Sequence, residues 1–264
     1  MGLKLFDKAL PDSFGGQRPA KTVEFPQGYK QSVNWIPRIG DIFPNFTVDS
    51  THGKINFHDW AEGNWVLLFS HPSIASAVSA TEFAALANCQ TDFDDRGVKV
   101  IGVSCDSTGD HARWQDEIER LFKLRITFPV VEDTDGTLSS AFGAVHPKQG
   151  RDFSIRKTFI IDPTLKVKLI NEYPINVGRS VEETLRTIDA LQIAEYHRLG
   201  LPADWEFGQP CTVAPYIDND QARRAHGKVK VLSRTIRLVD CPTGPPNDDV
   251  PAPPPQSISE TYRR

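Results

Sequence analysis

Buried strands are the clearest elements in the pattern of hydrophobic and polar positions along the chain. Continuous apolar runs at 65–70 (WVLLFS) and 98–105 (VKVIGVSC) predict two strands that are buried on both faces. A shorter run at 128–133 (FPVVED) predicts a third strand. Apolar pieces on either side of the turn at 51–53, and again around the turn at 162–165, predict two β-hairpins.

Helices are predicted where apolar residues recur every three to four positions. The segments 79–95 and 106–124 have this spacing, and LSSAFGAV predicts a short helix. A further helix is predicted over 180–194, where Ser180 as N-cap and Glu183 three residues later form a capping-box pair. Strands and helices alternate before the second hairpin, which predicts a mixed sheet covered by helices on both faces.

The composition divides the chain into four segments. Residues 1–38 are rich in Pro, Gly and Gln without a period and predict an extended arm, and 39–198 form the main α/β domain. Short β pieces and loops over 199–241 predict a small C-terminal domain that contains β-strands. Residues 242–264 are polar and rich in proline, so we expect this tail to be disordered.

Charge and hydropathy restrict the possible partners. The 264 residues have a net charge of −4 and a pI near 6.0, which argues against a nucleic-acid or membrane-surface partner. The basic segment 221–230 predicts a solvated helix and turn. Because the chain has neither a run of about 18 apolar residues nor a secretory h-region, we expect a cytoplasmic protein.

The cysteines do not form a motif. The sequence has no Cys-x-x-C pair and no phosphate-binding glycine loop, so it predicts neither a metal site nor another cofactor. Widely spaced cysteines in a chain of this length are usually reduced, which agrees with a reducing compartment. The four are Cys89, Cys105, Cys211 and Cys241.

The stretch FSHPSIASAVSATEF (69–83) contains the candidate chemistry. An apolar strand ends at His71 and Pro72, small residues follow, and a helix begins. Such a junction surrounds one side chain with backbone N–H groups and the positive end of a helix dipole, which activates a nucleophile. Here that side chain is Ser79.

Several motifs in the same order carry a family resemblance over about 39–240. They are GDIFPNFTVDS, FHDW, LLFSHP, GVKVIGVSCDS, HARWQDEI, FPVVED, IDPTLKVKL, YPINVGRS and LPADWEFG. The sequence resembles the one-Cys branch of the peroxiredoxins. The resemblance implies an α/β thioredoxin fold of the peroxiredoxin type, with a small C-terminal β-containing domain. It also implies a homodimer that pairs through edge strands, for which 158–174 supplies the candidate.

The resemblance also implies a site. Peroxiredoxins have a Pro-x-x-x-Thr/Ser-x-x-Cys element and an arginine from a distant strand. Counting from Pro72 places the hydroxyl at Ser76 and puts Ser79 where the family has its peroxidatic cysteine. Arg156 aligns with the family arginine. The candidate catalytic residues are therefore Ser79, Arg156, His71 and Ser76, and the candidate residues for binding a small-molecule substrate are Pro72, Val78, Glu82 and Arg179.

Serine at position 79 excludes peroxide reduction there. A hydroxyl has a pKa far above that of a thiol, and it lacks the oxidisable sulfur that forms a sulfenic acid. Cys89 cannot replace it, since ten residues along a helix separate the two by about 15 Å. We predict a protein of peroxiredoxin fold whose pocket binds or transforms a small oxygenated substrate with Ser79, His71 and Arg156.

Two alternatives stay open. The first alternative to this prediction is a one-Cys thiol peroxidase present as a Cys-to-Ser variant. The second is a non-catalytic binding or scaffold dimer. Family members usually have TPVCTTE where this chain has SAVSATE, so Ala77 and Ala80 also depart from the pattern. A designed point change leaves its neighbours alone, which favours natural loss of the cysteine.

Overall fold

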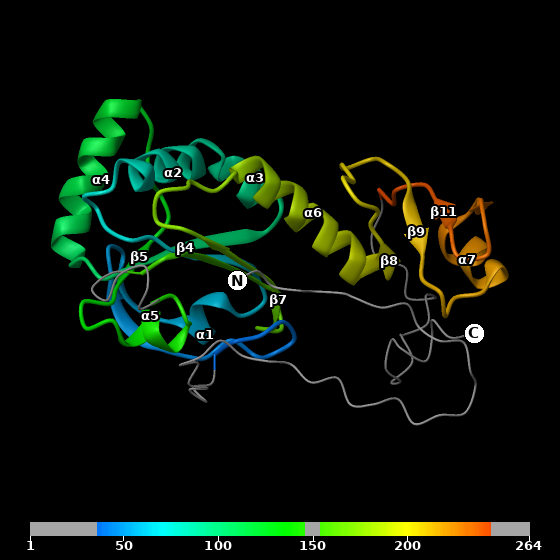
Figure 1. The fold of residues 1–264 in the computed structure, drawn as a ribbon, viewed down its shortest axis with the longest axis horizontal. Helices are drawn as coiled ribbons and strands as arrows, with labels where there is room; N and C mark the ends of the chain where they lie inside the picture. The colour runs from blue at the N-terminus through cyan, green and yellow to red at the C-terminus, as the bar shows by residue number, and fades with distance from the viewer. Residues whose placement is uncertain (1–35, 146–153, 244–264) are drawn as a thin grey trace, which may run out of the picture. The chain divides into compact units, whose positions relative to one another are not determined.

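The computed structural model describes residues 36–145 and 154–243 (Figure 1). The predicted N-terminal arm lies outside these residues except for its last three positions, and the predicted Pro-rich tail lies outside them except for its first two. The larger of two sheets has seven strands in the order β2-β1-β5-β4-β3-β6-β7. Its strands are β1 (Thr47–Ser50), β2 (Gly53–Asn56), β3 (Trp65–Ser70), β4 (Val98–Ser104), β5 (Val130–Glu132), β6 (Arg156–Ile161) and β7 (Val167–Tyr173).

Helices cover both faces of this sheet, as the alternation of elements predicts. Figure 1 shows α1 and α5 on the opposite face from α2, α3 and α4, and separate hydrophobic clusters lie on the two faces. The helices are α1 (Phe57–Ala61), α2 (Ala77–Asn88), α3 (Gln90–Asp95), α4 (Thr108–Phe122), α5 (Thr137–Ala141) and α6 (Val181–His197).

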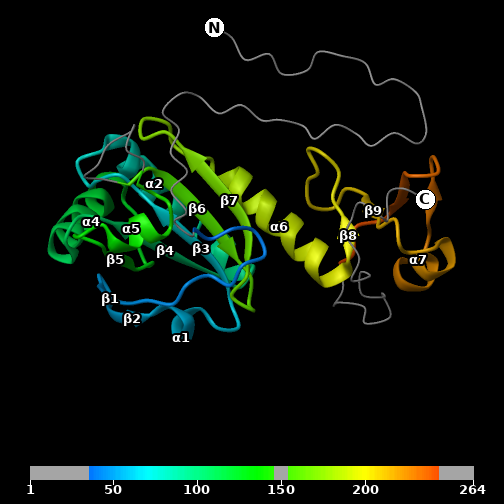
Figure 2. The same ribbon diagram turned by 60° about the horizontal axis from the view of Figure 1, so that its bottom comes forward.

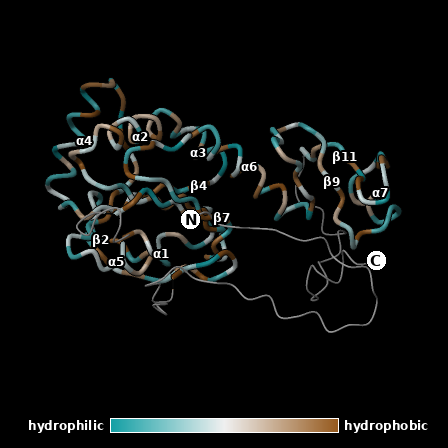
Figure 3. The backbone as a smooth tube through the Cα atoms, in the orientation of Figure 1, coloured by the Kyte–Doolittle hydropathy of each residue, from teal (hydrophilic) through white to brown (hydrophobic). Residues whose placement is uncertain are grey.

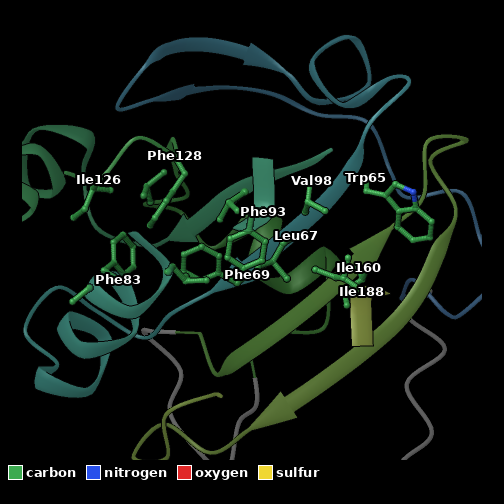
Figure 4. Packing of buried hydrophobic residues seen from close by; sticks show 14 of the residues in the cluster. Trp65, Leu67, Phe69, Phe83, Phe93, Val98, Ile126, Phe128, Ile160 and Ile188 are labelled. Atoms are coloured by element: carbon green, nitrogen blue, oxygen red, sulfur yellow. The ribbon is translucent and has the colours of Figure 1, made fainter. Parts of the chain in front are cut away.

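The interior strand β3, between β4 and β6, has one hydrophobic cluster on each of its faces. All six of its residues are buried, which confirms the prediction from its continuous apolar run. Because strand side chains alternate, Leu67 and Phe69 pack against α2 and α3, whereas Leu68 packs on the opposite face. Figure 4 shows Phe69 beside Phe83 of α2, and their ring centroids lie 5.4 Å apart. Helix α4 is mostly hydrophilic with a few hydrophobic positions (Figure 3), and its buried residues are His111 and Ile118.

Both predicted hairpins are present, whereas two local predictions were wrong. The segment predicted as one helix over 79–95 starts at Ala77 and breaks into α2 and α3 at Cys89, whose backbone (φ −99°, ψ 15°) leaves helical geometry. The capping box before α6 is only half formed. Ser180 Oγ accepts the Glu183 N–H at 3.1 Å, but the Glu183 carboxylate binds Arg186 at 2.6 Å instead of returning to the cap.

The second sheet is antiparallel, with the order β10-β11-β9-β8. Figure 2 shows its strands β8 and β9 beside α7. Its elements are β8 (Leu199–Gly200), β9 (Cys211–Val213), α7 (Asn219–His226), β10 (Lys230–Val231) and β11 (Arg237–Val239). Helix α7 confirms the helix predicted within the basic segment 221–230. That 199–241 forms a domain of its own stays a prediction.

Within residues 36–145 and 154–243, no helix combines the length and the apolar character that crossing a bilayer requires.

Candidate active site at the start of helix α2

The loop between β3 and α2 places Ser79 in the first turn of the helix. Ile74 N–H donates to the Asp106 carboxylate at 2.9 Å, and Ser104 Oγ holds that carboxylate at 2.8 Å, which ties the loop to the end of β4. Ser76 is the N-cap of α2 and accepts the Ser79 N–H at 3.3 Å. Ser79 therefore lies at the positive end of the helix dipole, as the sequence predicts.

Arg156 joins the two serines to a carboxylate. Its Nη1 donates to Ser79 Oγ at 3.2 Å and to Glu82 Oε2 at 2.6 Å. Its Nη2 donates to Ser76 Oγ at 3.1 Å and to the Ile175 carbonyl at 2.7 Å, and its Nε donates to the same carbonyl at 3.0 Å. The guanidinium has five N–H donors, so all of them are occupied. Its side chain is fully buried.

Glu82 is shared between two arginines. Its Oε1 accepts the backbone N–H and the Nε of Arg179 at 2.8 and 2.9 Å, and its Oε2 accepts Arg179 Nη2 at 2.8 Å. Burial and the nearby Arg179 lower the pKa of Arg156, while Glu82 opposes that shift. With Ser79 neutral, two guanidinium groups face one carboxylate among the described residues, so this cluster of described side chains carries one positive charge in excess.

His71 does not join this hydrogen-bond network. Its ring is stacked on Trp114 with centroids 5.6 Å apart and meets His111 edge-on at 5.0 Å. Within the described part of the chain, neither ring nitrogen of His71 has a hydrogen-bond partner. Burial, followed by His111 and the two site arginines, lowers the pKa of His71 well below its ordinary value, so the ring is neutral. It makes no hydrogen bond to Ser79.

The other predicted binding residues, Pro72 and Val78, make no hydrogen bond to the network in the ranges that the structure describes. Pro72 is buried, and Val78 borders Gly178, where an added Cβ would lie 3.3 Å from Val78 Cγ1. The structure thus brings Ser76, Ser79, Glu82, Arg156 and Arg179 into one network and leaves His71 outside it.

Sequence reasoning missed three participants. The Thr158 hydroxyl accepts from Arg179 Nη1 at 3.1 Å, the Ile175 carbonyl accepts twice from Arg156, and His111 packs on His71. A run of three polar residues, Arg-Lys-Thr, inside the buried strand β6 was a signal for Thr158. A backbone carbonyl leaves no such signal in the sequence.

Comparison with known proteins agrees with this architecture. The model of the AhpC/TSA family matches residues 39–170, half of the chain. This chain belongs to the AhpC/TSA family. It is 39% identical over 191 residues to 1-Cys peroxiredoxin A of Oryza sativa subsp. japonica, which covers 70% of this chain and 86% of that protein. It is 34% identical to the mitochondrial peroxiredoxin PRX1 of Saccharomyces cerevisiae, over 80% of this chain and 83% of the relative.

Among solved structures, a Cys-to-Ser mutant of the peroxiredoxin 6 of Arenicola marina has a TM-score of 0.75 and 35% identity. The match covers 78% of this chain and 99% of that one. These likenesses confirm the α/β thioredoxin-like peroxiredoxin fold with a small C-terminal antiparallel sheet. As a member of the AhpC/TSA family homologous to one-Cys peroxiredoxins, the chain fits the thiol-peroxidase alternative better than a repurposed pocket.

Proposed function

We propose that this chain has the peroxide-binding frame of a one-Cys thiol peroxidase and, with Ser79 in place of the reactive cysteine, binds a peroxide without reducing it. The observation that carries the proposal is the contact of Arg156 Nη1 with Ser79 Oγ at 3.2 Å, in the first turn of α2. This is the position at which a helix N-terminus and a guanidinium would lower the pKa of a thiol.

The chemistry of oxygen explains why we expect no peroxide reduction at Ser79. Peroxide reduction requires a thiolate that attacks one peroxide oxygen, becomes a sulfenic acid and releases water or an alcohol. The Ser79 hydroxyl stays protonated, because among residues 36–145 and 154–243 it has no base within hydrogen-bond reach and accepts a hydrogen bond from Arg156. The excess positive charge would favour a thiolate at this residue, because an anionic sulfur would balance the two arginines and Glu82.

The Ser79→Cys variant tests the proposal. We expect it to consume hydrogen peroxide with dithiothreitol as reductant and to yield a sulfenic acid that dimedone traps, whereas the unaltered chain stays at the background rate. Ser79→Ala is the matched control, since it alters the same buried position without adding sulfur. Peroxide turnover by the unaltered chain would refute the proposal, and so would a folded Ser79→Cys variant that is no faster than Ser79→Ala.

A second candidate function is binding of a small anionic or oxygen-rich molecule, as in the repurposed pocket that the sequence predicts. The excess positive charge beside Ser79 favours it, because a buried charge without a counterion is costly. Since Ser79 and Arg156 are fully buried, such a ligand has to displace a hydroxyl from the guanidinium. Calorimetric titration with acetate distinguishes this function: binding that disappears in Arg156→Met supports it, and equal binding by both proteins refutes it.

Pairing of two copies also remains a proposal. In the described residues, β7 lies at one edge of the seven-stranded sheet, within the segment that the sequence predicts for dimerisation. Val167, at the start of β7, is hydrogen-bonded to Gly40 and Asp41, and the remainder of this edge offers backbone N–H and C=O groups to a second strand. Light scattering on the purified chain tests the homodimer, and a monomer at micromolar concentration would contradict it. The cytoplasmic location stays a prediction, and one relative is named as mitochondrial.

A further inference from the structure

Two of the four cysteines are neighbours in the four-stranded sheet. Strands β9 and β11 pair antiparallel, with Cys211 opposite Val239. Cys241 follows Val239 by two positions, just beyond the end of β11. Its thiol adjoins the thiol of Cys211. Both cysteines also belong to the same hydrophobic cluster, around Trp205.

The two thiols differ in their access to solvent. Cys211 is fully buried, whereas Cys241 is partly exposed. Burial, together with the adjoining Cys241 thiol, raises the pKa of Cys211 to about 12. Cys211 is therefore protonated at neutral pH, and Cys241 is the thiol that a dissolved reagent reaches first.

We propose that Cys211 and Cys241 form a reversible disulfide by exchange with a low-molecular-weight disulfide such as oxidised glutathione. The Cys241 thiolate attacks one glutathione sulfur, the glutathione S–S bond breaks, and one glutathione thiolate leaves. Cys211 then loses its proton and attacks the Cys241 sulfur of this mixed disulfide, which releases the second glutathione thiolate. The two protein thiols are oxidised by two electrons, and one oxidised glutathione becomes two reduced molecules.

The local structure suits this bond. Cys241 lies just beyond the end of β11, where its backbone is outside the strand ladder and can adjust to the geometry of a disulfide. The bond would join the end of β11 to the start of β9 and close a loop that contains α7 and β10. None of this involves Ser79, so the inference is independent of the proposed function.

Cys89 and Cys105 are natural controls. Cys89 lies at the junction of α2 and α3, and Cys105 Sγ lies 3.9 Å from Ser139 Oγ. Neither is placed beside another thiol among the described residues. Cys89→Ser and Cys105→Ser should therefore leave the disulfide unaffected.

The test equilibrates the full chain with mixtures of oxidised and reduced glutathione, then quenches with acid, alkylates and digests with trypsin. Cleavage after lysine and arginine releases Cys211 in the peptide 199–223 and Cys241 in the peptide 238–263. We expect mass spectrometry to find these two peptides linked, with the loss of two hydrogens, in the unaltered chain and in both control variants.

Removing the inner thiol gives the second readout. In Cys211→Ser the glutathione on Cys241 cannot be displaced, so we expect this adduct to rise about tenfold or more over the unaltered chain, because a neighbouring thiol acts at an effective concentration in the millimolar range or above. The inference is overturned if the linked peptides form at no glutathione ratio. It is also overturned if Cys241 of the unaltered chain holds as much glutathione as Cys241 of Cys211→Ser.

Discussion

Glu82→Gln tests whether one buried carboxylate holds the candidate site together. The substitution keeps the shape of the side chain but removes the charge that faces Arg156 and Arg179, at 2.6 and 2.8 Å. The excess positive charge then rises from one to two in a cluster where the Glu82 and Arg156 side chains are 4% and 0% exposed.

The expected loss is large. Removing one partner of a buried ion pair costs about 3–5 kcal/mol, because it leaves a buried charge uncompensated. Glu82 compensates two guanidinium groups, so we expect the upper part of this range. For a chain of this size, that corresponds to a fall in Tm of roughly 10–20 °C. Urea unfolding followed by tryptophan fluorescence, with thermal unfolding followed by circular dichroism, measures both quantities.

The exposed pair Glu183–Arg186 provides the matched control. Its carboxylate side chain is 52% exposed, so Glu183→Gln should cost less than about 1 kcal/mol. Combining Glu82→Gln with Arg179→Met returns the cluster to one positive charge in excess, and we expect it to recover part of the lost stability. If Glu82→Gln costs no more than Glu183→Gln, charge compensation does not stabilise the site and the reasoning fails.

Two further predictions concern the core around the site. Burial lowers the pKa of His111 from 6.5 to about 4. Between pH 4 and 6.5 the folded state therefore binds fewer protons than the unfolded state, so the free energy of unfolding falls by about 3 kcal/mol as the pH drops from 6.5 to 4. Chemical unfolding across this range should show a weaker pH dependence in His111→Phe; an unchanged slope would contradict the assignment. Gly102→Ala would place a Cβ 3.1 Å from Val130 and should lower the free energy of unfolding by about 1–3 kcal/mol. Gly109→Ala in α4, where the added Cβ has no neighbour closer than 4.0 Å, should leave it unchanged or raise it by up to about 1 kcal/mol. Equal unfolding midpoints for the two glycine variants would refute this contrast.

The sequence by itself determined the elements and the local frame of the site. The run WVLLFS predicts β3 because a strand buried on both faces has no polar face to display. The run of small residues after His71 and Pro72 predicts a strand-to-helix junction with Ser79 at the start of the helix, since such junctions are set by a few neighbouring residues. Short-range interactions of this kind can be predicted from neighbouring residues in the sequence. The break at Cys89 was missed because nothing in the local pattern interrupts the apolar spacing.

Only the tertiary structure decided which distant groups meet. Arg156 reaches Ser79 because β6 pairs with β3, on which α2 packs, although 77 positions separate the two residues. His71 stacks on Trp114 because α4 packs against the end of β3, and no pattern in the sequence indicated this contact. Cys211 and Cys241 become neighbours through the pairing of β9 with β11. Strand pairing and burial act across the whole chain, so they set these contacts where local sequence spacing carries no information.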